Sequence, residues 1–202
     1  DAGETAFDNC VYTRAEVTRL AKKGFELAMT RSKKLCCVDK ANVLETSRLW
    51  RETVQAMEKD YPEVTVSYEF VDAVAMRLVQ WPNSYDVLIT ENLFGDILTD
   101  EASVISGSMG LMPSASLGKT VGLFEPIHGS YPQATGLNIA NPMATVLSAA
   151  MMFENFGLQE EGQAIRDAVN NALDKGIVTE DLADGGTAYG TKEVGDWLAA
   201  NI

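Results

Sequence analysis

The sequence lacks several features that would place its function immediately. It has no run of about 18 apolar residues and does not open on a signal peptide, so we expect no membrane-spanning segment. It has no internal repeat and no low-complexity tract. Its three cysteines, Cys10, Cys36 and Cys37, are odd in number and two are adjacent. This argues against a disulfide framework and predicts a reducing, cytoplasmic setting.

Positive charge is also scarce. The chain carries 16 Lys and Arg against 29 Asp and Glu, a formal net charge of −13, which argues against a nucleic-acid or anionic-membrane partner. Its 202 residues, 46% of them hydrophobic, are typical of a globular protein with one large domain or two smaller ones. The chain has no initiator Met and opens on the polar stretch DAGETAFDN, so we expect a piece of a longer protein or a linker at this end.

Apolar strands and amphipathic helices alternate in the first half of the chain, which predicts an α/β fold. The first helix covers residues 13–32, where Thr13 and Glu16 can form a capping box in front of an apolar stripe. The strands expected after it are residues 35–38, 64–70 and 87–90, and the helices begin at Ser47, Ala73 and Phe94. Sites in open α/β sheets gather beyond the carboxyl ends of strands, so we expect a site at the strand-to-helix junctions.

Two aspartates stand at the last of these junctions. Asp96 and Asp100 are four residues apart in the stretch VLITENLFGDILTD (87–100), so a helix presents both on one face. Their repulsion costs a few tenths of a kcal/mol, and no Lys or Arg nearby in sequence relieves it. Two carboxylates with waters and substrate oxygens are a normal way to hold Mg²⁺ or Mn²⁺. The alternative is an ordinary solvated acidic face.

Two other junctions carry one candidate each. Lys40 follows an apolar strand and precedes Asn42, so it is either a partly desolvated general base or a surface lysine paired with Asp39 or Glu45. Asp72 opens an apolar helical segment, where an acid either caps the helix or ligates a metal. Because all these candidates recur at the same kind of junction, a shared crevice is favoured.

The second half of the chain differs in character. Residues 103–118 are rich in Ser and Gly, which predicts close backbone packing and a domain boundary nearby. A strand at 121–124 leads into a polar turn with the chain's only histidine, His128, which either faces a ligand or hydrogen-bonds the backbone of the turn. The remaining expected helices are 143–156, with Asn141 as N-cap and Pro142 at its first position, then 160–175, closed by Gly176, and 191–200.

Four stretches carry a resemblance to a known family: VDKANVL (38–44), VDAVAM (71–76), TENLFGDILTDEASVISGSMGLMPSASLG (90–118) and FEPIHGSYPQATGLNIANP (124–142). They resemble the metal- and NAD(P)-dependent β-decarboxylating dehydrogenases, from about residue 11 to the end of the chain. The isopropylmalate dehydrogenases match best, and isocitrate and tartrate dehydrogenases match less well in the loops. This family does not use the GxGxxG fingerprint, and the sequence contains none.

The resemblance implies NAD-dependent oxidative decarboxylation of 3-isopropylmalate to 2-oxoisocaproate, in leucine biosynthesis, by a homodimer whose active site is shared between subunits. Asp96 and Asp100 match the Mg²⁺ or Mn²⁺ ligands of the family, joined by Asp72 of the other subunit. Lys40, also contributed across the dimer, matches the base that takes the proton of the substrate hydroxyl. The other matches are Asn42 near the nicotinamide and substrate, Val43 near the substrate side chain, and Glu125, His128, Gly129, Ser130 and Asn141 in the loop around the NAD adenosine.

The sequence departs from the family in two respects. The segments that supply the substrate-binding arginines and the tyrosine acid lie upstream in the family and do not occur here, and Tyr12 matches a position downstream of that tyrosine. Gln133 stands where NAD-using members carry an aspartate. Because Gln can still hydrogen-bond a ribose and supplies no positive charge for a 2′-phosphate, NAD is favoured over NADP.

We therefore expect an isopropylmalate dehydrogenase-like α/β fold, with an incomplete mixed sheet and flanking helices. Residues 1–106 would form most of the dimerising, metal- and substrate-binding domain, and residues 107–202 the C-terminal part of the NAD-binding domain. The helices at about 72–80 and 92–105 would pack into an intersubunit four-helix bundle. The isolated chain would be catalytically inactive. The alternatives are a dimerising metal-binding module without catalysis and another member of the family.

Overall fold

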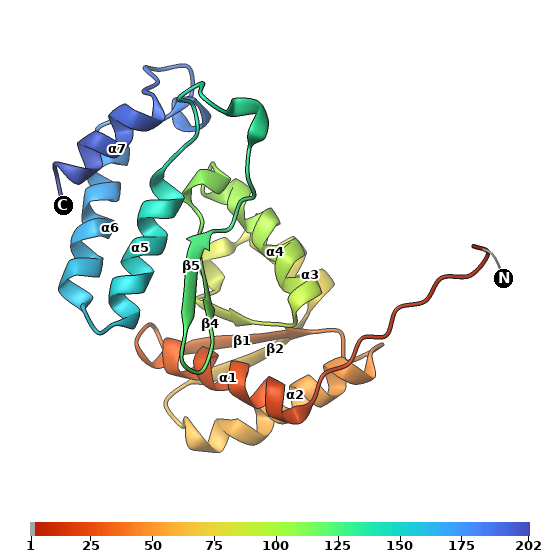
Figure 1. Ribbon diagram of the computed structural model, residues 1–202. Coiled ribbons are helices and arrows are strands. Elements are labelled where there is room, and N and C mark those ends of the chain that lie inside the picture. Colours follow the sequence, from red (N-terminus) through yellow and green to blue (C-terminus); the bar gives the residue numbers. More distant parts are fainter. Residues whose placement is uncertain (1–2) are drawn as a thin grey trace. The chain divides into compact units, whose positions relative to one another are not determined.

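The computed structural model describes residues 3–202 (Figure 1). The chain folds into two compact units, of which the first ends at Ala102 and the second begins at Ser103. Among residues 3–202, no helix is both long enough and apolar enough to cross a membrane. The three cysteines are free thiols, with Cys10 exposed and the other two buried.

The first unit is built on a parallel sheet of three strands. Strand β1 (Lys34–Asp39) lies at the centre, with β2 (Thr65–Phe70) on one side and β3 (Val87–Ile89) on the other. Both neighbours run parallel to β1, and Asp39, its last residue, is opposite Phe70. The parallel order requires helical crossovers between the strands, which the sequence supplies as alternating apolar runs and amphipathic segments.

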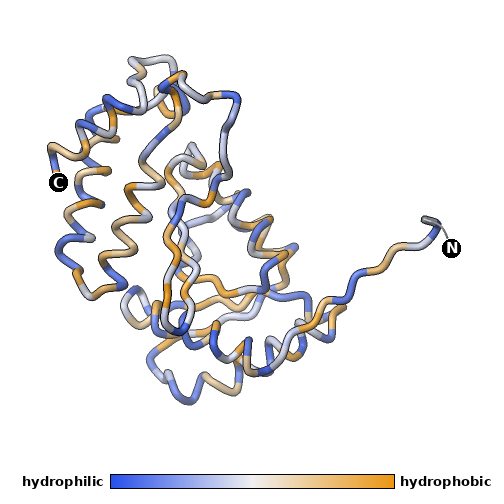
Figure 2. Tube along the Cα trace, in the orientation of Figure 1, coloured by the Kyte–Doolittle hydropathy of each residue, from blue (hydrophilic) through white to orange (hydrophobic). Residues whose placement is uncertain are grey.

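Helices cover both faces of this sheet. Leu35 and Cys37 pack with residues of α1 (Arg14–Met29) and α2 (Glu45–Met57), whereas Cys36 and Val38 pack with residues of α3 (Val71–Gln80) and α4 (Asn92–Ile105). Alternate side chains of a strand point to opposite faces, so a strand that is covered on both sides is apolar throughout. Figure 2 shows this contrast between the hydrophobic strand and the mixed colouring of the helices around it.

Local capping fixes where the key helices begin. Thr13 and Glu16 form the expected capping box at the start of α1, which confirms that prediction. At α4 the carboxylate of Glu91 accepts the N–H groups of Leu93 (3.0 Å) and Phe94 (3.2 Å), and the hydroxyl of Tyr12 donates to the same carboxylate at 2.8 Å. An acid is favourable here because the unpaired N–H groups of a helix start carry partial positive charge.

The second unit combines a hairpin with three helices. Strands β4 (Pro113–Leu117) and β5 (Gly122–Pro126) pair antiparallel. Helix α5 (Met143–Asn155) packs against this hairpin and against α6 (Gln159–Asp174). Helix α7 (Thr191–Ala199) closes a core that includes Met143, Ala168, Val169, Val194 and Leu198. As expected, Gly176 follows α6 with a positive φ of 67°, the conformation that ends many helices.

The α/β class is confirmed, with three differences in detail. The parallel and antiparallel pairings lie in separate sheets, and β4 falls in the segment that the sequence describes only as rich in Ser and Gly. Helix α2 begins at Glu45 and not at Ser47, since the carbonyl oxygen of Leu44 already accepts the N–H of Arg48 at 3.1 Å. The Ser47 hydroxyl is buried and accepts the backbone N–H of Lys40 at 3.0 Å.

Gly24 gives a test of the packing between α1 and the sheet. A Cβ atom at this position would lie 2.3 Å from Cγ2 of Ile89, a buried β-branched side chain of β3 that cannot swing away. We expect Gly24→Ala to destabilise the protein by about 1–2 kcal/mol, since overpacking outweighs the gain in helix propensity. Gly195→Ala is the matched control: it lies inside α7 with no atom near the added methyl, so it should leave stability unchanged or raise it. Urea unfolding of both variants decides, and equal effects would contradict the packing argument.

Candidate functional site

Lys40 lies directly after β1, in a turn whose backbone is fully anchored. Its N–H donates to the Ser47 hydroxyl, and its carbonyl oxygen accepts the N–H groups of Val43 and Leu44, both at 2.9 Å. Its ammonium group pairs with the carboxylate of Asp72 and lies 5.7 Å from the ring centroid of Phe70. Two residues that the sequence predicts for one site are thus brought together, although 32 positions separate them.

Asp72 lies in the first turn of α3 with its carboxylate exposed to solvent. The hydrogen bond from Lys40 lowers the pKa of Asp72 below its ordinary value, so the acid is ionised wherever the pair exists. The alternative interpretation of Lys40 as a lysine paired with Asp39 or Glu45 is wrong, because Asp39 binds Arg51 and Glu45 binds Arg48.

Asp96 and Asp100 lie on α4, four residues apart and both exposed. Their carboxylate oxygens are the hard ligands that Mg²⁺ and Mn²⁺ prefer, so the donor set fits such an ion. Within residues 3–202, no three side chains of His, Cys, Asp or Glu are grouped closely enough to hold a metal ion. A single chain therefore does not assemble Asp72, Asp96 and Asp100 into one centre.

Asn42 and Val43 occupy the turn between Lys40 and α2. Both are exposed, and Val43 has 62% of its surface accessible, which is unusual for an apolar side chain in a structured turn. Val43 therefore forms the apolar side of a small exposed surface, and Lys40 and Asn42 form its polar side.

The residues predicted to contact a cofactor lie in the second unit, along β5 and the loop that follows it. Glu125 is an exposed residue of β5, and Gly129, Ser130 and Gln133 are exposed in the loop. Nδ1 of His128 lies 3.1 Å from the carbonyl oxygen of Gly129, which is the simple backbone contact that the sequence leaves open for this histidine.

The far end of this loop is tied to α7. Asn138 has a φ of 58°, a left-handed conformation that Asn tolerates better than most residues. Its backbone oxygen accepts the N–H of Thr191 at 2.9 Å, and its side-chain oxygen accepts the N–H of Lys192 at 2.9 Å. The Thr191 hydroxyl also donates to the carbonyl oxygen of Ala140. Loop and helix start therefore order each other.

Asp181 is a site residue that the sequence did not reveal. Its carboxylate accepts hydrogen bonds from Ser108, Thr179 and Asn141, and the distance to Nδ2 of Asn141 is 3.0 Å. Asn141 uses its side-chain oxygen to accept the N–H of Met143 at 3.0 Å. The prediction of Asn141 as N-cap and Pro142 as the first helical residue is wrong by one position, because α5 begins at Met143 and Pro142 is its N-cap. Asp181 thus orients the amide that binds the first N–H of α5. A local sequence pattern cannot predict the contact between Asn141 and Asp181, because 40 positions separate them.

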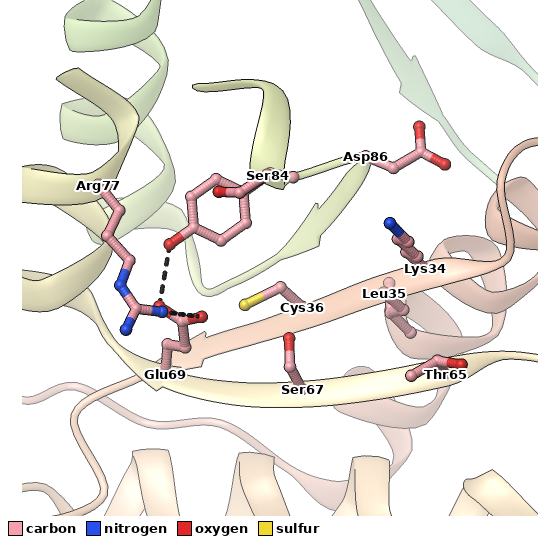
Figure 3. A pocket seen from close by; sticks show the side chains of 10 residues that line it. Lys34, Leu35, Cys36, Thr65, Ser67, Glu69, Arg77, Ser84 and Asp86 are labelled. Carbon is pink, nitrogen blue, oxygen red and sulfur yellow. Dashed lines mark hydrogen bonds and ion pairs between the residues drawn. The ribbon is translucent and has the colours of Figure 1, made fainter. Parts of the chain in front are cut away.

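A pocket of about 240 Å³ is lined by Lys34, Leu35 and Cys36 of β1 and by side chains that include Glu69 and Arg77 (Figure 3). The carboxylate of Glu69 accepts hydrogen bonds from Arg77 at 2.7 Å and from Tyr85 at 2.9 Å, so the charged groups at one end of the pocket satisfy each other. Burial and the bond to Glu69 raise the pKa of Tyr85 to about 12, and burial raises that of the Cys36 thiol to about 11. Both groups stay neutral at physiological pH. The pocket contains none of the predicted site residues.

Asp181 gives a prediction for the dependence of stability on pH. Partial desolvation raises the pKa of this carboxyl, but the three hydrogen bonds together bring it below its ordinary value. Its contribution is therefore fully present above about pH 3.9, the ordinary value, and is lost as the pH falls through the lower folded-state pKa. We expect Asp181→Asn to lower stability at pH 7 by about 1 kcal/mol or less, because solvent screens the group.

The measurement is urea unfolding of the wild type and the variant at pH 7, 4 and 3, where the gap should close toward the lowest pH. Asp184→Asn is the control, since Asp184 is exposed nearby and has a positive φ of 43° that Asn tolerates. A gap that stays constant with pH would show that the ionised carboxylate is not what stabilises the loop.

Comparison with known proteins gives a consistent result. Residues 1–198 match the isocitrate/isopropylmalate dehydrogenase family. The chain is 58% identical over 200 residues to a 3-isopropylmalate dehydrogenase of Bacteroides fragilis, covering 98% of this chain and 57% of the relative. It is 52% identical over 204 residues to a 3-isopropylmalate dehydrogenase of Desulfitobacterium hafniense, covering 100% of this chain and 58% of the relative.

Solved structures agree on the fold. An isocitrate dehydrogenase from Methylococcus capsulatus superposes with a TM-score of 0.92 at 36% identity, covering 98% of this chain and 59% of that chain. A β-decarboxylating dehydrogenase from Thermococcus kodakarensis gives 0.88 at 36% identity, covering 100% of this chain and 59% of that chain. The chain thus spans less than two thirds of the length of these relatives. With a match over nearly its whole length, the chain belongs to the isocitrate/isopropylmalate dehydrogenase family.

Proposed function

We propose that this chain contributes to an NAD- and Mg²⁺- or Mn²⁺-dependent dehydrogenase that oxidises and decarboxylates 3-isopropylmalate to 2-oxoisocaproate, a step of leucine biosynthesis in the cytoplasm. The observation that carries the proposal is the contact between Lys40 and Asp72 at the carboxyl end of β1. It pairs a general base with a carboxylate at the edge of an α/β sheet where ligands bind.

The metal would be held by Asp96 and Asp100 of one subunit and Asp72 of a second. Three carboxylates suit a hard divalent cation, and the ion would polarise the forming carbonyl and stabilise the enolate left by decarboxylation. A site shared between subunits agrees with the absence, within the described part of a single chain, of any group of three such ligands.

The apolar surface of α3 and α4 supports a homodimer. Met76 and Val79 on α3 have 62% and 66% of their surface exposed, and Leu93 and Ile97 on α4 have 62% and 58%. Large apolar side chains exposed on neighbouring helices are typical of an interface. The first unit would then be the dimerising, metal- and substrate-binding part and the second unit the C-terminal part of the NAD-binding domain.

In its neutral amine form, Lys40 would take the proton of the substrate hydroxyl while a hydride passes to the nicotinamide. Asp72 holds its ammonium group at the end of the sheet, and Asn42 and Val43 beside it would face the nicotinamide and the substrate side chain. The chain supplies neither the substrate-binding arginines nor the tyrosine acid expected from the family, so we expect the isolated chain to be inactive.

The adenosine of NAD would lie against the loop that contains Glu125, His128, Gly129, Ser130 and Gln133, with Asn141 at its end. The ties to α7 and Asp181 hold this loop in a defined conformation. Gln133 can bind ribose hydroxyls and offers no positive charge to a 2′-phosphate, which favours NAD.

Isopropylmalate is preferred to isocitrate as the substrate because of the relatives. The two 3-isopropylmalate dehydrogenases share 58% and 52% of residues with this chain, whereas the isocitrate dehydrogenase of known structure shares 36%. A dimerising module that binds metal without catalysis would keep the apolar faces of α3 and α4 and bind no NAD.

The shared metal site can be tested by complementation. We expect Mn²⁺ binding, followed by electron paramagnetic resonance, to be lost in Asp72→Asn and in Asp96→Asn, because each removes a ligand from every site of the homodimer. Mixing the two variants, with unfolding and refolding to exchange subunits, should restore about one quarter of the wild-type sites, since half of the dimers are then mixed and each has one intact site. Asp196→Asn, an exposed acid of α7, is the control and should bind normally.

If the mixture recovers no Mn²⁺ binding while both variants are folded and dimeric, a metal site shared between subunits is ruled out. Two further measurements separate the candidate functions. Titration with NAD by calorimetry should give weak heats, which the non-catalytic module would not give. NADH production from 3-isopropylmalate with Mn²⁺ should stay at background, and turnover at the level of the complete relatives would refute the proposed inactivity of the chain.

A further inference from the structure

The residue before Lys40 is a buried acid. Asp39 is only 1% exposed, and an ionised carboxylate is costly to bury unless charged and polar partners compensate it. Its Oδ2 accepts a hydrogen bond from Nε of Arg51 at 2.7 Å, and its Oδ1 accepts one from Nη2 of Arg51 at 3.0 Å. Oδ1 also accepts a hydrogen bond from the N–H of Ala41 at 2.9 Å. The paired bonds from one guanidinium hold the carboxylate in a defined plane.

Arg51 is itself held by two aromatic rings. The guanidinium carbon lies 5.5 Å from the ring centroid of Tyr68 and 5.2 Å from that of Phe70, both within the range of a cation–π contact. The two rings belong to β2, where Tyr68 is opposite Cys37 and Phe70 is opposite Asp39. Helix α2 thus supplies a cation that is fixed by the central strand and its neighbour together.

These contacts reach Lys40 by two routes. Asp39 precedes Lys40 and binds the N–H of Ala41, which follows it, so the pair with Arg51 fixes the backbone on both sides of the lysine. Phe70 is shared: its ring centroid lies 5.2 Å from the guanidinium of Arg51 and 5.7 Å from the ammonium of Lys40. A shift of the guanidinium would therefore move both the turn and the ring against which the lysine rests.

We propose that Arg51 is a positioning residue for Lys40, acting through the carboxylate of Asp39 and the ring of Phe70. This inference rests on the proposed role of Lys40 as general base. Arg51 acts through these two groups and is not a catalytic residue. Its function is to keep the side-chain nitrogen of Lys40 beside Asp72, where a substrate hydroxyl would meet it.

Arginine is required for this role, and another cation is not equivalent. Lysine can keep one ion pair with Asp39, but it lacks the planar fork that binds both oxygens and stacks on the rings. Methionine has a similar length and leaves the carboxylate buried without a cationic partner. We therefore expect Lys40 to be held less well in Arg51→Lys than in the wild type, and least well in Arg51→Met.

The experiment reads the position of Lys40 directly, on the whole chain and without metal, substrate or NAD. In protein labelled with ¹³C-lysine, the ε-methylene protons of Lys40 should be displaced upfield by the ring current of Phe70, and a Lys40→Arg chain identifies their signal by its disappearance. We expect Arg51→Lys to reduce the displacement and Arg51→Met to abolish it. Acetylation of Lys40, followed by mass spectrometry, should become severalfold faster in the same order.

Arg166→Lys is the matched control. Arg166 makes the same paired contact with Glu154, at 2.6 and 3.0 Å, but it lies in the second unit. It should leave the Lys40 signal and the acetylation rate unchanged. Val54→Ala, a core change in the same helix as Arg51, separates positioning from general loss of stability and should also leave the signal in place.

The proposal is overturned if the Lys40 signal and acetylation rate are the same in wild type and Arg51→Lys with the fold intact by circular dichroism. It is also overturned if Val54→Ala moves the signal as far as Arg51→Lys does. Should Arg51→Met not fold, Arg51→Lys decides alone. The proposed function fails on separate grounds, by the loss of Mn²⁺ complementation, and that outcome would leave the effect of Arg51 on Lys40 measurable.

Discussion

The pleat of β1 is the constraint on which the proposed site depends. Successive side chains of a strand leave opposite faces of the sheet, so Asp39 turns toward α2 and meets Arg51, while Lys40 turns toward α3 and meets Asp72. A slip of one residue in register would bring the lysine against Arg51 and the acid against Asp72, two repulsive pairs in place of two attractive ones. The charges at the end of β1 thus support the register that its apolar residues establish.

The neighbouring strand contributes to the same arrangement. Because β2 runs parallel to β1, its last residue, Phe70, stands beside Asp39, and α3 begins at once with Val71 and Asp72. The end of β2, the ring of Phe70 and the carboxylate of Asp72 therefore lie close together, because no loop separates β2 from α3. A longer connection between β2 and α3 would give Asp72 more freedom to move, whereas the direct one keeps it within reach of Lys40.

The sequence predicts what is local and misses what depends on distant partners. The capping box at Thr13, the apolar strand before Lys40 and the glycine that ends α6 are written in a few adjacent residues, and the structure confirms them. The shared kind of junction favours a common crevice for Lys40 and Asp72, but the ion pair between the two side chains is not written in adjacent residues. The sequence pattern does not single out Arg51, because it lies 12 residues from Asp39, on a helix whose apolar residues dominate its pattern.

Charge explains why metal binding and association of two chains would be linked. The chain has a formal net charge of −13. When Asp96 and Asp100 of one copy approach Asp72 of another, the repulsion between their negative charges opposes association of the two chains. Lys40 offsets one of these three charges, and a divalent cation would offset the other two. The exposed apolar residues of α3 and α4 favour association of the same elements that carry the acids. Hydrophobic burial would then supply the affinity between the chains, and the ion would remove the repulsion that remains where the acids meet.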